Sequence, residues 1–442
     1  MSTRLIDCLA TTPLLAEVFE DRSVLQAMLR FEVALARAEA GLGVIPALAA
    51  ETIAAAAAVP EAFDPGHVAA AATATGTVAI GVVARLTALV REKDAEGATY
   101  VHWGATSQDV TDTAMVLLLD RVRTILQADH QRLLAALRSL SDRHAATVMS
   151  GRTLLQPSTP VTFGLKAAGW HAACARGWRR VGMAFDEALV LQFGGASGTL
   201  AALGDRGPDV ASALGRELGL RVPSAPWHAH RDRLGGLMAA LGVYTASLGK
   251  MATDVSLLMQ AEVGEAAESG GVSSSMPQKR NPAGCAVALA AATRVPGLVA
   301  AFLSGMAQQH ERGLGGGHAE MPTIAAIAQA AGAALSAITR VAGELQIDPA
   351  RMRANIDATR GTMLAERAIV ILAPVLGREA ARALVATAAA EAMAQGRGLG
   401  DMLAATPQVA GVRTRVDLTC LDHPDSYLGA AEQFRLRLLA DS

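Results

Sequence analysis

The sequence has 442 residues, of which 51% are hydrophobic but only 3% aromatic, and its formal net charge is −2. This length is enough for two or three domains with a large core. The small net charge and the lack of a basic block argue against nucleic acid as a partner. Cys8, Cys174, Cys285 and Cys420 show no CxxC spacing, which favours reduced thiols over disulfides or a zinc site.

Alanine is the commonest residue type in long stretches of the chain, and strand signals are few. Because alanine is the strongest helix former, the composition predicts an all-α protein. The longest uncharged run, about residues 322–339, has few large side chains, which favours a buried bundle helix over a membrane span. The N-terminus lacks the charged-then-apolar order of a signal peptide. We therefore expect a cytoplasmic protein without membrane association.

The first region of the chain is predicted to be helical and to end near residue 111. Apolar residues at helical spacing predict a helix over Ser23–Gly41, which the glycines at its end would stop. An alanine-rich helix is predicted over Pro46–Val59. The turn at Asp64-Pro65 should precede one further helix, from about His67 to Arg91.

The motif VHWGATSQDVTDT follows from Val101 to Thr113. A loop is predicted at Gly104–Gln108, followed by a helix that begins near Asp112. Two interpretations stay open for the hydroxyl side chains of this motif. Either they cap the helix, a role that suits Ser107 or Thr111, or they bind a ligand.

Two later motifs interrupt the long helical runs. The first is GRTLLQPSTP, from Gly151 to Pro160. Its Thr153 and Gln156 either donate hydrogen bonds to a ligand carboxylate or are ordinary turn residues. Trp227-His228-Ala229-His230 suggests a metal site, but no acidic or cysteine cluster accompanies it and the flanking prolines indicate a loop. We therefore expect no metal there.

The most specific stretch is GGVSSSMPQKRNP, from Gly270 to Pro282. Asn281 is a good helix N-cap and proline is favoured at the first helical position, so the run predicts a flexible loop that ends at a helix N-terminus. A helix N-terminus beside Lys279 and several hydroxyls suits an anionic ligand.

This stretch resembles the signature loop GSSxMPxKxNP of the fumarase/aspartase superfamily, with Val272 where the pattern has its glycine. The resemblance implies that Ser273, the first serine of the pattern, is the catalytic base. It also implies that Lys279 takes part in substrate binding and catalysis, and that Asn281 binds substrate.

The earlier motifs resemble the same superfamily. Thr106 and Ser107 match hydroxyls that hold a substrate carboxylate, and His102 matches a histidine of several branches. We treat His102 as a catalytic candidate, with a lone histidine satisfied by a backbone carbonyl as the alternative. In the GRTHLQ loop of the superfamily, several branches place an acid histidine where this chain has Leu154. Thr153 and Gln156 are retained as substrate-binding candidates.

Three further stretches, RVPGL, HERGLG and DSYLGAAEQF, together with HWGATSQDVTDT, are similar to the 3-carboxy-cis,cis-muconate cycloisomerase branch. The resemblance makes Arg312 a substrate-binding candidate, with a solvated helix end as the alternative. The motif HAE, at His318–Glu320, is similar to that branch as well. The branch tends to carry bulky aromatics around this motif, where this chain has Gly316, Gly317, Met321 and Pro322.

The superfamily resemblance implies an all-α fold of three domains around a long-helix bundle. We place the domains at residues 1–111, 112–360 and 361–442, with the last boundary at the break Arg360-Gly361-Thr362. The resemblance further implies a homotetramer whose active sites draw on three subunits, a small polycarboxylate as substrate, and neither a metal nor an organic cofactor.

Reactions of this superfamily remove a proton next to a carboxylate, which leaves a dianion that preorganised donors must stabilise. Serine acts as a base only as a stabilised alkoxide in a closed loop, and Gly270 and Gly271 allow that loop to move. A carboxylate leaving group has a pKa of about 4 and needs no acid. Leu154 therefore fits lactone formation better than amine release.

The expected function is conversion of 3-carboxy-cis,cis-muconate to 4-carboxymuconolactone. Two alternatives stay open. One is a lyase that releases fumarate from an argininosuccinate- or adenylosuccinate-like substrate, against which Leu154 argues. The other is a structural protein, like the lens crystallins derived from this superfamily, against which the joint presence of Ser273, Lys279 and Asn281 argues.

Overall fold

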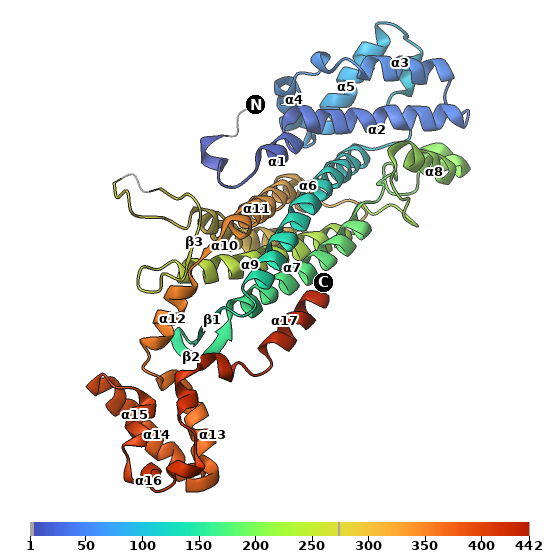
Figure 1. The fold of residues 1–442 in the computed structure, drawn as a ribbon. Coiled ribbons are helices and arrows are strands. Elements are labelled where there is room, and N and C mark those ends of the chain that lie inside the picture. Colours follow the sequence, from blue (N-terminus) through green and yellow to red (C-terminus); the bar gives the residue numbers. More distant parts are fainter. Residues whose placement is uncertain (1–3, 273–274, 442) are drawn as a thin grey trace. The chain divides into compact units, whose positions relative to one another are not determined.

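The structure, a computed structural model, describes residues 4–272 and 275–441. Its contacts divide the chain into two compact units, each assembled from three separate segments (Figure 1). Unit 1 comprises Met1–His130, Gly177–Gly249 and Val287–Ala337. Unit 2 comprises Gln131–Arg176, Lys250–Ala286 and Ile338–Ser442.

Helices form nearly all of the regular structure among the described residues, so the prediction of an all-α fold is confirmed. The helices of the first half are α1 (Pro13–Val18), α2 (Asp21–Gly41), α3 (Ala47–Ala57), α4 (Pro65–Thr75), α5 (Val78–Arg91), α6 (Ser107–Arg143), α7 (Phe163–Ala188) and α8 (Gly207–Leu218). Those of the second half are α9 (Asp232–Leu258), α10 (Ala283–Ser304), α11 (Gly316–Glu344), α12 (Pro349–Asp357), α13 (Ala365–Leu376), α14 (Arg378–Gln395), α15 (Leu399–Ala404), α16 (Pro407–Ala410) and α17 (Ala431–Ala440). The strands are β1 (Val148–Thr153), β2 (Gln156–Thr162), β3 (Ala266–Ala267) and β4 (Gln346–Ile347).

In unit 1, α2 is the helix against which α3 and α8 pack. The predictions for α2 and α3 are confirmed to within two residues at each end. The single helix expected from His67 to Arg91 is wrong, because the chain forms two helices there, α4 and α5. Gly76 adopts a left-handed conformation with φ of 71° and ends α4, while the Thr77 side chain caps α5.

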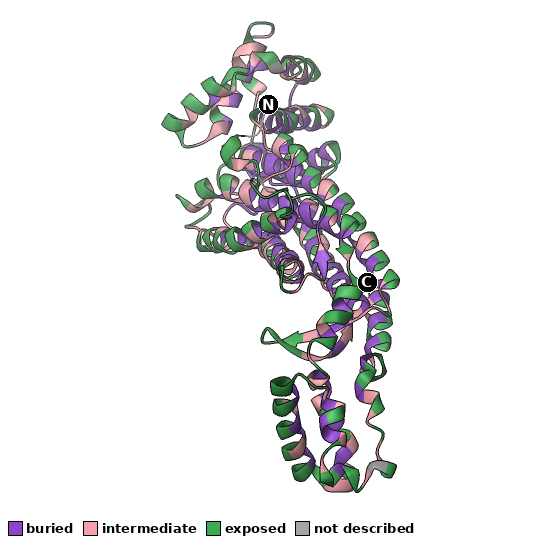
Figure 2. Cartoon of the chain, turned by 60° about the vertical axis from the view of Figure 1, so that its left-hand side comes forward, coloured by how far each residue is buried: buried purple, intermediate pink, exposed green. Residues whose placement is uncertain are grey.

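The long helices of unit 1 meet through aromatic and small side chains. His130 of α6 stacks on Trp178 of α7, with ring centroids 4.8 Å apart, and bonds to the hydroxyl of Tyr244 on α9 at 2.8 Å. Gly177 lies so close to the Tyr244 ring that a Cβ there would be 2.8 Å from it. Small residues thus let these helices approach closely, and buried residues follow their inner faces (Figure 2).

In unit 2, β1 and β2 form an antiparallel hairpin, with Thr153 opposite Gln156 at its tip. The bidentate ion pair of Arg152 with the fully buried Glu265 anchors this hairpin at 2.7 and 2.9 Å. Farther along, α13, α14 and α15 enclose a hydrophobic cluster that includes Leu372 and Leu399. The C-terminal helices therefore have a core of their own.

Two helices of the described chain, α10 and α11, are long and apolar enough by composition to cross a membrane. In α11, which includes the uncharged run, 61% of the most apolar window is buried within the protein, so it is a bundle helix as expected. In α10 only 22% of the corresponding window is buried. Much of the apolar surface of α10 is therefore uncovered in a single chain.

The junction of α6 and α7 generates a prediction about stability. Gly164 donates its N–H to the His144 carbonyl at 2.9 Å, and a Cβ at Gly164 would lie 2.7 Å from Ala145 Cα and from the Ser141 carbonyl oxygen. We expect Gly164→Ala to lower the free energy of unfolding by about 1–3 kcal/mol. The control Gly169→Ala, in the same helix with nothing near its added methyl, should raise it by about 0.5–1 kcal/mol. Denaturant unfolding measures both, and equal effects would contradict the proposed crowding.

Candidate functional site

The N-terminus of α6 carries the Thr-Ser motif. The helix begins at Ser107, so the predicted start near Asp112 is wrong. The carboxylate of Asp109, three residues after Thr106, accepts a hydrogen bond from the Thr106 N–H at 3.0 Å. This is one half of a capping box. The hydroxyls of Thr106 and Ser107 do not cap the helix and can contact other groups.

Asp109 is fully buried and also bonds to two other loops of unit 1. Its oxygens accept the N–H groups of Gly194 at 3.0 Å and Gly195 at 2.9 Å, and Oδ1 lies 2.7 Å from Nε2 of His228. One carboxylate therefore joins the Thr-Ser loop, the glycine turn and the WHAH segment. His228, part of the rejected metal motif, serves here as a partner of Asp109.

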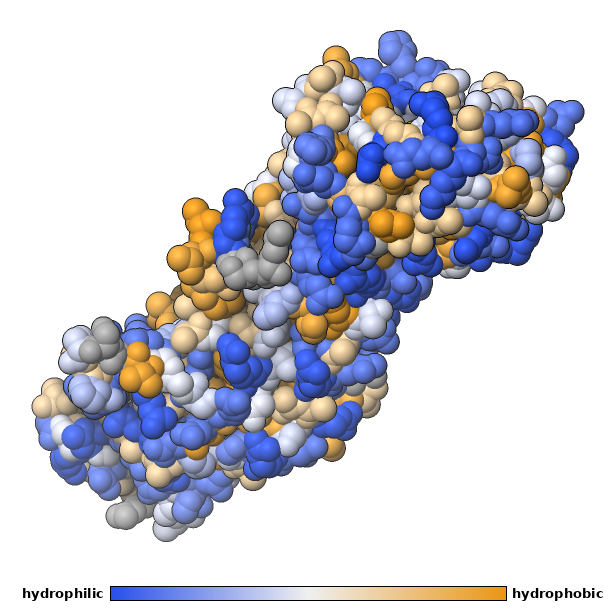
Figure 3. Space-filling view, turned by 90° about the horizontal axis from the view of Figure 1, so that it is seen from above, coloured by the Kyte–Doolittle hydropathy of each residue, from blue (hydrophilic) through white to orange (hydrophobic). Residues whose placement is uncertain are grey.

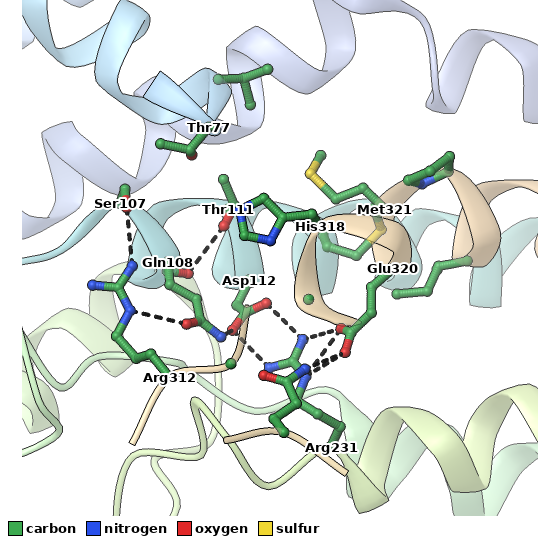
Figure 4. A pocket seen from close by; sticks show the side chains of 18 of the residues that line it. Thr77, Ser107, Gln108, Thr111, Asp112, Arg231, Arg312, His318, Glu320 and Met321 are labelled. Atoms are coloured by element: carbon green, nitrogen blue, oxygen red, sulfur yellow. Dashed lines mark hydrogen bonds and ion pairs between the residues drawn. The ribbon is translucent and has the colours of Figure 1, made fainter. Parts of the chain in front are cut away.

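Arg312 gathers the hydroxyls of the Thr-Ser loop. Its Nη1 donates to Thr106 Oγ1 at 2.7 Å and its Nη2 donates to Ser107 Oγ at 3.2 Å. Its Nε donates to Gln108 Oε1 at 3.2 Å (Figure 4). Three residues predicted as substrate ligands, Thr106, Ser107 and Arg312, are thus brought together. Two hydroxyls around one guanidinium form a polar cluster with the chemistry to hold a carboxylate.

Ser107, Gln108 and Arg312 border a cavity of about 460 Å³ within unit 1. Ser107 and Arg312 lie at one side of it, and His318 and Met321 at the other (Figure 4). Leu234 adds to its apolar lining. A cleft of this size, largely apolar with a few convergent polar groups, is typical of a small-molecule site.

A buried ion network forms one wall of the cavity. Arg231, the residue before α9, pairs bidentately with Asp112 of α6 at 2.8 Å and also binds Glu320 of α11. The side chains of Arg231, Asp112 and Glu320 are at most 10% exposed. Burial raises the pKa of Glu320 against the opposing effect of Arg231. Because Arg231 is fully engaged, it supports the wall rather than offering a vacant cation to a ligand.

His102, the remaining candidate in unit 1, lies in the loop before the Thr-Ser motif. Its Nδ1 is 2.7 Å from Oε1 of Glu32 on α2. The alternative of a histidine satisfied by a backbone carbonyl is therefore wrong for this atom, since its partner is a carboxylate.

In unit 2, the hairpin tip exposes the residue that departs from the superfamily pattern. Leu154 and Leu155 form a two-residue loop with φ of 51° and 65°, and their side chains are 97% and 74% exposed. Hairpin turns with two positive φ angles prefer Asn-Gly, so two leucines here are unfavourable in water. Thr153 and Gln156 flank this tip and are exposed.

The signature loop also lies in unit 2, and its described ends meet. Val272 and Arg280 form an antiparallel bridge, and the Asn281 N–H bonds to the Gly271 carbonyl at 2.8 Å. A Cβ at Gly271, whose φ is 66°, would collide with the Asn281 carbonyl. Lys279 is exposed. Ser273 lies outside the described residues.

The N-terminus of α10 already holds an anion supplied by the protein. The buried carboxylate of Glu268 accepts the N–H groups of Gly284 at 2.8 Å and Cys285 at 3.0 Å. The helix begins at Ala283, so the prediction that Asn281 caps it is wrong. Glu268 fills the position that we had expected an anionic ligand to occupy.

Sequence reasoning missed Asp109, Asp112, Arg231 and Glu320 as organisers of the cavity. Asp109 had a local signal, since the spacing Thr-x-x-Asp is that of a capping box. The other three come from distant segments, and no local pattern predicts their pairing.

Comparisons with known proteins extend these observations. Residues 8–297 match the family described as Lyase, and residues 361–438 match Adenylosuccinate lyase C-terminus. The chain is 45% identical to 3-carboxy-cis,cis-muconate cycloisomerase of Bradyrhizobium diazoefficiens, over 97% of this chain and 98% of the relative. It is 41% identical to nitrosuccinate lyase of Streptomyces davaonensis, over 96% of this chain and 91% of the relative. The crystal structure of 3-carboxy-cis,cis-muconate lactonizing enzyme from Pseudomonas putida matches with a TM-score of 0.93 and 43% identity, over 99% of each chain.

The buried ion network generates a second prediction. Arg231→Met leaves two buried carboxylates without their cation, so we expect a loss of about 3–5 kcal/mol in unfolding free energy at neutral pH. The control Arg353→Met, at the half-exposed pair with Asp357, should cost less than about 1 kcal/mol.

The pH dependence of the Arg231→Met deficit provides an independent check. Burial raises the folded-state pKa of Glu320, and loss of Arg231 removes the charge that opposes this effect. Protonation therefore favours the folded mutant, and the deficit should shrink as pH falls. Thermal unfolding of wild type and mutant between pH 8 and pH 5 measures it. A deficit that is independent of pH would show that lost packing, and not unpaired charge, is responsible.

Proposed function

The chain belongs to the fumarase/aspartase superfamily of lyases, and we propose that it converts 3-carboxy-cis,cis-muconate to 4-carboxymuconolactone. The observation that carries this proposal is the end-to-end match to relatives named for that substrate. The cluster of Arg312, Thr106 and Ser107 supports it, because a tricarboxylate needs several separate carboxylate sites.

In the proposed reaction, a carboxylate of the substrate adds to its own diene and closes a lactone. In the reverse direction, Ser273 removes the carbon-bound proton next to a second carboxylate, and the lactone carboxylate leaves. The developing dianion is held by Lys279 and Asn281 of the signature loop and by the hydroxyls of Thr106 and Ser107. Closure of the loop stabilises the serine alkoxide.

Arg312 has a part in this scheme as a substrate ligand. In the structure its guanidinium donates to both hydroxyls of the Thr-Ser loop, so it keeps them oriented without substrate. A substrate carboxylate that enters the cluster accepts hydrogen bonds from the same groups. The exposure of Arg312 lets it turn toward the ligand at little cost.

Leu154 supports lactone chemistry over release of an amine. The leaving carboxylate has a pKa of about 4 and needs no general acid. The apolar tip of the hairpin would keep water from a reactive diene and its dianion. A 41%-identical relative is named nitrosuccinate lyase, so nitrosuccinate is a second candidate substrate, and argininosuccinate and adenylosuccinate are less favoured.

We propose that the protein is a cytoplasmic homotetramer with three domains per chain, at 1–111, 112–360 and 361–442, and with shared active sites. The largely uncovered apolar helix α10 and the exposed Leu154 support association of copies. Exposed hydrophobic side chains also occur among hydrophilic ones on the surface (Figure 3). Contact with further copies would cover such surfaces.

The substrate assignment is tested with purified protein and Leu154→His. We expect wild type to remove the ultraviolet absorbance of 3-carboxymuconate and to release no fumarate from argininosuccinate or adenylosuccinate. Leu154→His should not accelerate lactonisation and should slow it, because a polar ring replaces an apolar aliphatic side chain. Rates on these substrates and on nitrosuccinate are measured side by side. Efficient fumarate release by wild type would overturn both the assignment and the leaving-group argument.

The base and the shared site are tested together. Ser273→Ala should lower kcat by at least about 100-fold, whereas Ser212→Ala, an exposed serine on α8, should have no effect. Thr106→Val should also be inactive because it loses a donor to the substrate carboxylate.

An equal mixture of Ser273→Ala and Thr106→Val subunits, dissociated and reassembled, then tests whether a site uses both residues from different subunits. The mixture should recover about a quarter of wild-type activity, because random assembly gives each site an even chance of each native residue. No recovery after verified reassembly, or full activity of a monomer, would reject shared sites.

A further inference from the structure

A buried carboxylate of α2 has a single hydrogen-bond partner within the described part of the chain, the ring of His102. Glu32 is 1% exposed, and its Oε1 lies 2.7 Å from Nδ1 of His102. Its second oxygen, Oε2, is buried and has no hydrogen-bond partner among the described residues. The carboxylate is therefore not shared with any other donor among the described residues, and its one hydrogen bond, through Oε1, goes to the imidazole of His102.

The other nitrogen of the ring is left available. No described residue bonds to Nε2 of His102, and this atom does not appear among the buried unsatisfied atoms. The side chain retains 18% exposure. A ring fixed through Nδ1 by a carboxylate and open at Nε2 is the arrangement by which proteins set the tautomer and direction of a working histidine.

The backbone holds this arrangement in place. His102 has a φ of 61°, in the left-handed region that non-glycine residues rarely adopt. Its carbonyl oxygen accepts a hydrogen bond from the N–H of Ala105, the residue before Thr106, at 3.4 Å. A strained conformation of this kind persists only where surrounding contacts enforce it, and the bond to Glu32 is one such contact.

The charges around the ring favour its protonated form. Burial lowers the pKa of His102, but the charge of Glu32 and its hydrogen bond, with a smaller effect of Asp109 on α6, raise it overall. Asp109 is already bonded to His228, so Glu32 is the carboxylate that acts on His102 through direct contact.

We propose that Glu32 is a positioning residue for His102, and that this dyad presents a protonated Nε2–H to a carboxylate of the substrate. The inference rests on the proposed lactone chemistry for the identity of that carboxylate. The protonated ring of His102 donates a hydrogen bond to the carboxylate and places a positive charge beside it, and no proton is transferred. Its effect is largest where the negative charge of the substrate grows, in the transition state.

The same helix supplies a matched control. Glu39 lies two turns after Glu32 on α2, is fully buried, and has neither carboxylate oxygen bonded to a described residue. Burial, and secondarily the charge of Glu32, raise its pKa to about 9. Glu39 is thus neutral at pH 7, and Glu39→Gln changes neither the charge of α2 nor any bond to His102.

The experiment compares Glu32→Gln with Glu39→Gln in the full-length protein. The His102 imidazole is titrated by NMR, with His102→Gln used to assign its signal, and kcat/KM for 3-carboxymuconate is measured against pH. Removing the charge at position 32 should lower the pKa of His102, so activity should be lost at lower pH than in wild type. At neutral pH we expect kcat/KM to fall by about tenfold or more, mainly through kcat. Glu39→Gln should match wild type in both measurements.

An unshifted His102 titration in folded Glu32→Gln would overturn the dyad. If Glu32→Gln does not fold, Glu32→Asp keeps the charge but withdraws the carboxylate, and it must also lower the pKa of His102. If Glu32→Gln and Glu39→Gln changed the pKa of His102 and kcat/KM equally, the role of Glu32 would be structural and the proposal would be rejected. Failure of wild type to lactonise 3-carboxymuconate would instead refute the proposed function, because the NMR titration needs no substrate.

Discussion

The carboxylate of Asp109 is the constraint on which the candidate site in unit 1 depends. It is fully buried, yet it bonds to the start of α6, to the glycine turn at Gly194 and Gly195, and to His228. Burying a charge costs free energy that hydrogen bonds to its lone pairs offset. The loops must therefore keep one arrangement to satisfy Asp109, and that arrangement places the Thr106 and Ser107 hydroxyls beside Arg312.

The protein also supplies its own anions at several places where cationic groups would otherwise attract ligands. Glu268 caps α10, while Asp112 and Glu320 occupy Arg231. Among the described residues that line the cavity, Arg312 keeps an exposed guanidinium available to a ligand, with the hydroxyls of Thr106 and Ser107 beside it. Internal pairing of this kind restricts where a carboxylate can bind. Recognition of a polycarboxylate then depends on the positions of the few donors that remain available and not on overall positive charge.

The sequence predicted elements with strong local signals and missed those set by distant partners. The apolar spacing of α2 predicted a helix correctly, but the break at Gly76 was missed because either side of it favours helix. Asn281 looked like an N-cap, yet Glu268 took that role from outside the local sequence. Arg312, Thr106 and Ser107 were found through motifs and do meet, whereas Ser273 and the domain boundaries stay predictions.

The pair Leu154-Leu155 links the chemistry to assembly. In an isolated chain these residues combine an unfavourable left-handed backbone with nearly complete exposure of two apolar side chains. A turn selected for a solvated surface would carry Asn-Gly instead. In the function that we propose, this position lies near the reacting groups, because other superfamily branches place an acid histidine there. The strained backbone and the exposed apolar side chains are both explained if another copy of the chain covers the tip. Apolar contact with that copy would then offset the cost of the turn. In the shared site that we propose, the covered tip would also exclude water from the reacting groups.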